Sequence, residues 1–206
     1  AKDIVAKVEA LIVQSRLDGV VLTPPITDDA ALLERLDELG VPWSSISATE
    51  PYRRIGVMVD ERNAVREMIA HLVSLGHTRI AHIKGHFAHG ASRWRHDGYK
   101  DGLKQAGLRY DPSLVVEGEF SYDSGFAATN RLLDLERPPT AIFAANDDMG
   151  AGAISAICER GLSVPKDVSV CGFDDTPISR QIYPSLTTIR QTAREMGRLA
   201  GIEPLK

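Results

Sequence analysis

The chain has 206 residues, of which 43% are hydrophobic and 25% are charged, and its formal net charge is −4 at pH 7. This length suffices for a hydrophobic core in one domain or in two small lobes, and the composition is that of an ordinary globular protein. The negative net charge argues against binding of nucleic acid by this segment, because a surface that binds the phosphate backbone is basic. No apolar run approaches the roughly 20 residues of a membrane span, and no signal peptide opens the chain, so we expect a cytoplasmic protein that does not bind membranes.

Strands and helices alternate in the first part of the sequence. Apolar residues at helical spacing predict an opening helix through residues 4–12, and Gly19–Leu22 has the pattern of a short buried strand. Thr27 is expected to cap the next helix. Strands are then expected at Val41–Ile46 and Ile55–Val59. This repeated β-α-β rhythm predicts a parallel sheet.

The same rhythm continues to the end of the sequence. The expected strands are Arg79–Ile83, Leu114–Val116, Ala141–Ala145 and Val168–Phe173, and the expected helices between them include Arg93–Ala106 and Phe126–Leu135. We predict two α/β lobes rather than one continuous sheet. Residues 1–58 would form the first lobe, to which residues 192–206 return, and residues 59–191 would form the second.

Polar side chains follow two of the buried strands directly. Asn146 comes after Ala141–Ala145, and either Asp147 or Asp148 is expected to cap the helix that follows. Asp174 comes after the next buried strand. Ligands of open α/β sheets bind outside the carboxyl ends of the strands, so we expect Asn146 and Asp174 to be neighbours in a ligand site.

Cofactor and metal sites are poorly supported by the sequence. Gly150 and Gly152 imitate part of a dinucleotide fingerprint, but they lie inside a predicted helix, where close helix packing explains them better. His82, His86 and His89 have metal-like spacing, but neither a cysteine nor a carboxylate joins them, so a loop that lines a cleft is the favoured interpretation. We therefore predict neither a cofactor nor a metal.

Catalytic patterns are also weak. The sequence has no GxSxG or HExxH motif. Asp174 and Asp175 could form an acid/base pair, but one hydrogen-bond acceptor and one cap is the commoner use of adjacent carboxylates at a strand end. Cys158 and Cys171 are isolated and are expected to be buried free thiols. We predict that the protein is not an enzyme.

The residue types at the strand ends favour recognition of a neutral polyol. Asp and Asn accept hydrogen bonds from hydroxyl groups, Arg donates to adjacent oxygens, and an aromatic ring covers a sugar face. Arg95, Asn146 and Asp174 supply the polar set, and Phe120 supplies a ring. Taken singly, Arg95 could be a solvated helix residue and Phe120 a core residue. Their combination at successive strand ends carries the prediction.

From about Leu17 to Ala200 the sequence resembles the effector-binding core of the LacI/GalR family of bacterial transcription regulators. The matching segments are DGVVLTPP at 18–25, HLVSLGHTRIAHIKG at 71–85, SRWRHDGYKDGL at 92–103, PTAIFAANDDMGAGAISAICERGLSVPKDVSVCGFDD at 139–175 and PSLTTIRQ at 184–191. The resemblance implies a two-lobed, type I periplasmic-binding-protein-like α/β fold, with parallel sheets flanked by helices, that closes on a small molecule. By the same resemblance, Arg95, Asn146 and Asp174 match hydroxyl-binding residues, Phe120 matches an aromatic cleft position, and Gln191 lies at a crossover near the ligand.

The resemblance also implies a function for the whole protein. It would be a homodimeric cytoplasmic regulator that senses a small-molecule effector, expected to be a sugar, and thereby controls operator DNA allosterically. The helix-turn-helix that binds the operator is expected to be missing from this chain, which we expect to be truncated at both ends of the core. Ala193 stands where some sugar-binding members carry an aromatic residue, so the sequence departs from their pattern at this position. The alternative is a sugar-binding protein of a transport system with the same fold.

Overall fold

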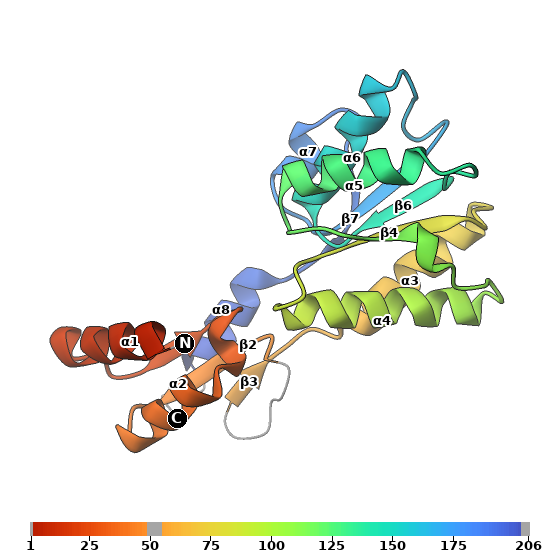
Figure 1. The fold of residues 1–206 in the computed structure, drawn as a ribbon. Coiled ribbons are helices and arrows are strands. Elements are labelled where there is room, and N and C mark those ends of the chain that lie inside the picture. Colours follow the sequence, from red (N-terminus) through yellow and green to blue (C-terminus); the bar gives the residue numbers. More distant parts are fainter. Residues whose placement is uncertain (1, 49–54, 203–206) are drawn as a thin grey trace. The chain divides into compact units, whose positions relative to one another are not determined.

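The computed structural model describes residues 2–48 and 55–202 (Figure 1). The chain divides into two compact units, one comprising residues 1–59 with 192–206 and the other comprising residues 60–191. Each unit contains a parallel sheet with helices packed on its faces. The predicted fold class, α/β with parallel sheets flanked by helices, is confirmed.

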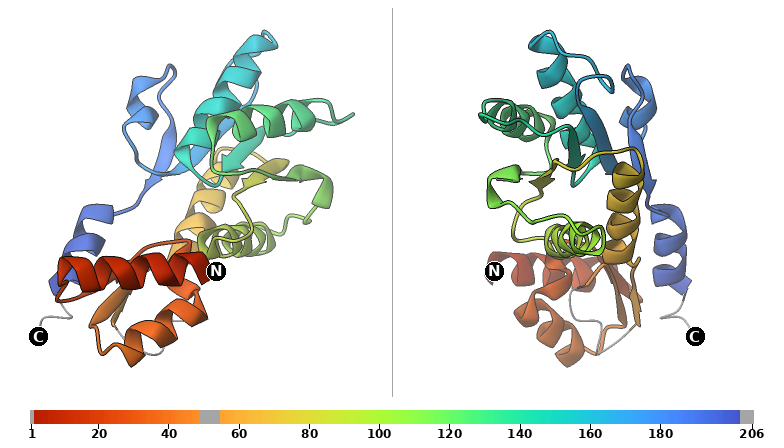
Figure 2. Two further views of the ribbon diagram at one scale, coloured as in Figure 1. Left: turned by 60° about the vertical axis from the view of Figure 1, so that its left-hand side comes forward. Right: turned by 90° about the vertical axis from the view of Figure 1, so that its right-hand side faces the viewer.

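The first unit is built on a three-stranded parallel sheet. The strands are β1 (Val20–Leu22), β2 (Trp43–Ile46) and β3 (Ile55–Val57), in the order β1-β2-β3. Its helices are α1 (Lys2–Ser15), α2 (Ala30–Glu38) and α8 (Ala193–Ile202), and a 3-10 turn, η1, spans Ile26–Asp28. Figure 2 shows α1 and α2 on one face of this sheet and α8 on the other. The Ser44 hydroxyl donates to the Ala200 carbonyl oxygen at 2.6 Å, which ties α8 to β2.

The second unit contains a five-stranded parallel sheet in the order β5-β4-β6-β7-β8. Its strands are β4 (Ile80–Lys84), β5 (Val115–Glu117), β6 (Ala141–Ala144), β7 (Ser169–Asp174) and β8 (Thr187–Arg190). Its helices are α3 (Glu61–Ser74), α4 (Gly90–Gln105), α5 (Tyr122–Leu133), α6 (Asp147–Glu159) and α7 (Ile178–Gln181), with a 3-10 turn, η2, at Pro112–Leu114.

The two faces of this sheet are covered by different helix pairs. Side chains of α3 and α4, among them Ile69 and Tyr99, pack on one face in a cluster with Phe143. Side chains of α5 and α6, among them Leu132 and Met149, pack on the other face. Burial of β6 and β7 from both sides explains the continuous apolar runs that identify these strands in the sequence.

Glycines allow α5 and α6 to approach closely. A Cβ atom at Gly152 would lie 2.1 Å from the carbonyl oxygen of Tyr122 in α5, and one at Gly125 would lie 2.3 Å from that of Met149. A Cβ atom at Gly150 would meet the Leu186 side chain at 2.8 Å. The prediction that close helix packing explains these glycines is confirmed for Gly152, whereas Gly150 packs against Leu186, which lies outside the helices.

Two predicted helix caps are wrong. The side chain of Asp29, not of Thr27, accepts from the Leu32 amide at the start of α2, because Thr27 lies within the turn η1. Asn146, not an aspartate, caps α6 by accepting from the Met149 amide at 3.0 Å. Asparagine and aspartate are about equally good caps, so composition alone could not choose between adjacent residues.

The cysteines differ from each other in exposure. Cys171 is buried in β7, where burial raises the pKa of its thiol, whereas Cys158 is exposed on α6. Both are free thiols, but the prediction that both are buried is wrong for Cys158. Cys158 lies in the last turn of α6, and the four residues that follow it are exposed as well.

The described helices fall short of a membrane span. None of those in residues 2–48 and 55–202 combines the length and the hydrophobicity that crossing a bilayer requires.

Candidate functional site

Arg95 is the centre of a polar cluster at the carboxyl end of the five-stranded sheet. It lies in α4 and is only 4% exposed, so it is not a solvated helix arginine. Its Nε donates to Glu61 Oε2 at 2.7 Å, its Nη1 donates to the Ala145 carbonyl oxygen, and its Nη2 donates to Asp174 Oδ1 at 3.4 Å. Its guanidinium carbon also lies 3.7 Å from the centroid of the Phe173 ring. These contacts hold the guanidinium in one orientation.

Asn146 and Phe120 are joined beside this arginine. The Asn146 side-chain Nδ2 donates to the Phe120 carbonyl oxygen at 3.0 Å. Phe120 has a φ of 57°, a left-handed conformation that an aromatic residue rarely adopts. Its ring centroid lies 5.9 Å from the guanidinium carbon of Arg95. Phe120 is partly buried, packs against the core cluster that contains Leu132 and Met149, and fills the space beside Gly85, where a Cβ atom would collide with the ring. Phe120 therefore presents a ring next to the polar cluster.

Asp174 ends β7 in an unusual backbone conformation. Its φ is 113°, and the next residue, Asp175, has a φ of 57°. The Asp174 carbonyl oxygen accepts from the Gln191 amide at 3.2 Å, which brings the chain after β8 to the same sheet end. Burial raises the pKa of the Asp174 carboxyl to about 6, against the lowering effect of Arg95, and the carboxylates of Asp147 and Glu61 raise it further.

All five residues predicted for the site therefore lie at one end of one sheet. They are Arg95, Phe120, Asn146, Asp174 and Gln191. The described contact of Gln191 with the other four residues is made by its backbone N–H and not by its side chain. Their role in ligand binding stays a prediction.

The sequence did not predict Glu61 as part of the cluster, and it predicted Asp147 only as a possible helix cap. Glu61 begins α3, is 2% exposed, and its Oε1 has no hydrogen-bond partner within the described residues. A signal for Glu61 was present, because it occupies the same helical stripe as the buried residues Val65 and Leu72. Asp147 is fully buried and accepts from the Thr176 amide at 2.7 Å and from the Thr188 hydroxyl.

The histidines do not converge on one point. His82 is buried in β4, its Nδ1 lies 3.0 Å from the Phe143 carbonyl oxygen, and burial lowers its pKa to about 3. His86 and His89 lie outside the strand, and His86 Nε2 is 3.7 Å from a carboxylate oxygen of Glu119. Among the residues described, no three histidine, cysteine or acidic side chains are grouped as metal ligands would be. His82 is thus a core residue that stacks on Phe143.

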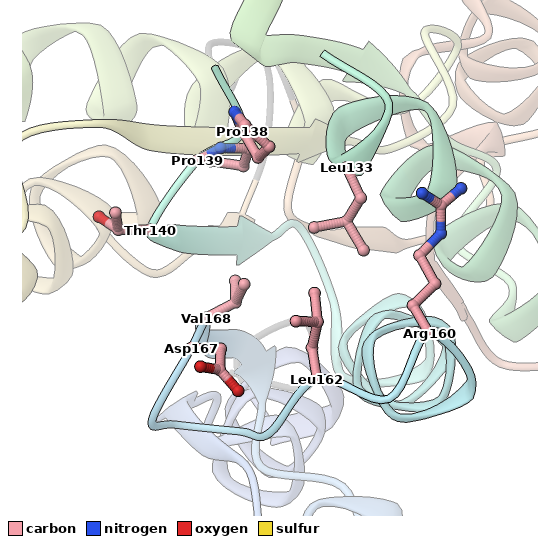
Figure 3. A pocket seen from close by; sticks show the side chains of 8 residues that line it. All are labelled: Leu133, Pro138, Pro139, Thr140, Arg160, Leu162, Asp167 and Val168. Atoms are coloured by element: carbon pink, nitrogen blue, oxygen red, sulfur yellow. The ribbon is translucent and has the colours of Figure 1, made fainter. Parts of the chain in front are cut away.

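The opposite end of the same sheet carries a separate pocket (Figure 3). Its volume is about 610 Å³. Its walls include the proline pair before β6, Val168 just before β7, and two charged residues, Arg160 and Asp167. Because these residues precede the strands that Asn146 and Asp174 follow, this pocket is not part of the Arg95 cluster.

The sequence of this chain is similar to those of known proteins over most of its length. A family model described as the periplasmic binding protein-like domain matches residues 69–202. The HTH-type transcriptional regulator DegA of Bacillus subtilis is 36% identical over 187 residues, which cover 89% of this chain and 55% of DegA. The chain thus spans about half the length of this relative.

Solved structures show the same similarity. A regulatory protein of the LacI family from Chloroflexus aggregans matches with a TM-score of 0.86 and 31% identity, over 95% of this chain and 70% of that one. A complex of the transcriptional regulator CelR with cellobiose matches with a TM-score of 0.87 and 34% identity, over 98% of this chain and 63% of that one.

Proposed function

Because the chain belongs to the LacI family of transcriptional regulators, we propose that it senses a neutral sugar through Arg95, Asn146 and Asp174. The observation that carries the proposal is the buried guanidinium of Arg95, held between the ends of β6 and β7. Arginine has five N–H donors, and three are used within the described residues. The remaining donors, with the oxygens of Asp174, match the paired donors and acceptors of neighbouring sugar hydroxyls.

Two further observations support a sugar over other small molecules. Phe120, a partly buried residue, places its ring 5.9 Å from the Arg95 guanidinium carbon, where it can cover the apolar face of a sugar ring. One relative of known structure, CelR, is described in complex with cellobiose. Gln191 completes the proposed site through its place beside Asp174.

The signal to DNA follows from a shift between two conformations of the whole protein. The effector favours the conformation that it binds better, and it can move the equilibrium only by that difference in affinity. We place operator binding in a helix-turn-helix outside this chain, in a cytoplasmic homodimer. The effector must then bind DNA-bound and free protein with different affinity, and equal affinities would contradict the mechanism. A transport role, the alternative with the same fold, has less support because DegA and CelR are both regulators by name.

Thermal unfolding in the presence of candidate ligands tests the proposal. The panel comprises pentoses, hexoses and cellobiose, with sugar phosphates and purines as competing classes. A ligand at 100 times its dissociation constant stabilises the native state by about 2.7 kcal/mol, which shifts the melting temperature by roughly 5–10 °C for a protein of this size. We expect a neutral sugar to give this shift and the Asp174→Ala variant to lose it. The exposed neighbour of the site, Asp148, provides the matched control Asp148→Ala, which should respond like the wild type. A shift with purines alone would overturn the sugar assignment and leave the family unaffected.

A further inference from the structure

Glu61 is the closest charged partner of Arg95, although the sequence did not predict it as a residue of the site. The Nε of Arg95 donates to Glu61 Oε2 at 2.7 Å, and the side chains of Arg95 and Glu61 are 5% and 1% exposed. A buried arginine without such a partner would attract any anion that reached it, because guanidinium pairs readily with carboxylate and phosphate. In this protein the Glu61 carboxylate takes the place of such an anion.

The charges around Arg95 do not balance. Arg95 faces Glu61 at 2.7 Å and Asp174 at 3.4 Å, so the single cation is matched by two carboxylates. Asp147 adds a third carboxylate, which is fully buried and whose described hydrogen bonds come only from uncharged donors of two threonines. When these acids are ionised, the cluster is electronegative although an arginine stands at its centre.

One carboxylate oxygen of Glu61 is left unused. Oε1 is buried and has no hydrogen-bond partner within the described residues, while Oε2 is taken by Arg95. A buried carboxylate oxygen without a donor is costly, so such an atom in a native protein calls for an explanation. This unused acceptor belongs to the residue that pairs with Arg95, at the centre of the proposed site.

We propose that Glu61 determines the specificity of the effector site, by neutralising Arg95 and offering Oε1 to a ligand hydroxyl. The site then takes an uncharged polyhydroxy ligand and rejects phosphorylated or acidic sugars. This inference rests on the proposed sensing function, and it adds the charge of the ligand and the residue that selects it. Stability alone does not account for the pair, because a buried ion pair is often no more stabilising than apolar residues of similar size.

Anion binding gives a test that does not require the natural effector. Inorganic phosphate is titrated at constant ionic strength and its binding is followed by thermal unfolding and calorimetry. We expect no Arg95-dependent phosphate binding by the wild type. In Glu61→Gln, which keeps the side-chain shape and removes the carboxylate 2.7 Å from Arg95, phosphate affinity should rise at least tenfold at pH 5. At this pH the Asp174 carboxyl, whose pKa is about 6, is mostly protonated and no longer neutralises Arg95. The gain should vanish in the double variant Glu61→Gln with Arg95→Met, which excludes binding elsewhere on the surface.

A matched control and two contrary outcomes complete the design. Glu67→Gln removes a charge from an exposed position of the same helix and should leave phosphate affinity unchanged. Phosphate binding by the wild type that Arg95→Met abolishes would overturn the proposal, and this comparison decides even if Glu61→Gln does not fold. A folded Glu61→Gln protein with unchanged phosphate affinity would overturn it as well. A failure of every neutral sugar to bind would instead contradict the proposed function. The phosphate titration tests the role of Glu61 separately, because it uses no sugar.

Discussion

The side chain of Asn146 donates from Nδ2 to the carbonyl oxygen of Phe120 at 3.0 Å, across 26 positions of sequence. Its Oδ1 at the same time accepts from the Met149 amide and caps α6. Asn146 therefore fixes the left-handed backbone at Phe120 as well as the start of a helix. Its two polar ends have different structural functions, which substitutions can separate.

Substitution of Asn146 should show both functions. Asn146→Ser keeps an oxygen for the cap and removes the donor, whereas Asn146→Asp keeps the cap and places an acceptor against the Phe120 carbonyl oxygen. We expect Asn146→Asp to lower the free energy of unfolding by about 1–3 kcal/mol and Asn146→Ser to lower it less, because only the aspartate leaves two acceptors facing each other. Urea unfolding measures both. Equal stability of Asn146→Asp and the wild type would contradict the described contact.

Arg95 and Glu61 should be strongly coupled in stability. Arg95→Met leaves the Glu61 carboxylate buried without its cation, which should cost roughly 3–5 kcal/mol. The double variant, with methionine at both positions, buries no unpaired charge and should be more stable than Arg95→Met alone. A double-mutant cycle from denaturant unfolding yields the coupling energy. Additive effects of the two substitutions would show that the 2.7 Å pair does not form.

The raised pKa of Asp174 predicts a pH dependence of stability. The carboxyl has a pKa of about 6 in the native state against 3.8 ordinarily, so native protein binds more protons than unfolded protein between these values. The free energy of unfolding therefore falls as pH rises from about 4 to 6, by about 3 kcal/mol from this group. Acids whose pKa is lowered, such as Asp175, act in the opposite direction. The quantity to measure is consequently the difference in the free energy of unfolding between the wild type and Asp174→Asn from about pH 4 to 6. A difference that does not change with pH would contradict the raised pKa.

Asp147 and Asp148 offer a matched pair for the buried carboxylate. Asp147 accepts hydrogen bonds from Thr176 and Thr188, whereas its neighbour Asp148 is exposed. Asp147→Asn replaces one acceptor oxygen with a donor group and weakens charge-assisted bonds, so it should destabilise the protein by roughly 2–3 kcal/mol. Asp148→Asn should change stability by less than about 0.5 kcal/mol. Thermal unfolding of the two variants compares them directly, and similar losses would show that burial of Asp147 has no energetic consequence.

The sequence was informative where burial leaves a repetitive pattern. Continuous apolar runs identified β6 and β7, and the rule that ligands lie at the carboxyl ends of parallel strands then placed Asn146 and Asp174 at one edge. Arg95 could be added because it belongs to a motif shared with a known family. Local choices among similar residues were not determined, so the cap of α6 was assigned to an aspartate instead of Asn146.

Glu61 shows a different reason for failure. An acidic residue in the first turn of a helix is favoured by the helix dipole, so Glu61 has the pattern of an ordinary exposed helix start. Its burial depends on Arg95, which lies 34 positions later in the sequence. A pair of this kind arises only from packing α3 against α4, and neither residue predicts the other. The single available signal was the position of Glu61 on the apolar stripe of α3.

The turn at Asp174 and Asp175 has a consequence for any attempt to engineer this protein. Two successive non-glycine residues with φ values of 113° and 57° are held in sparsely populated backbone regions, and the first of them also carries a partly buried acid whose pKa is raised. Glycine at position 174 would relieve both sources of instability. Directed evolution for heat resistance would therefore enrich variants at this turn that fold better and have lost their response to the effector, unless sensing is selected in the same round.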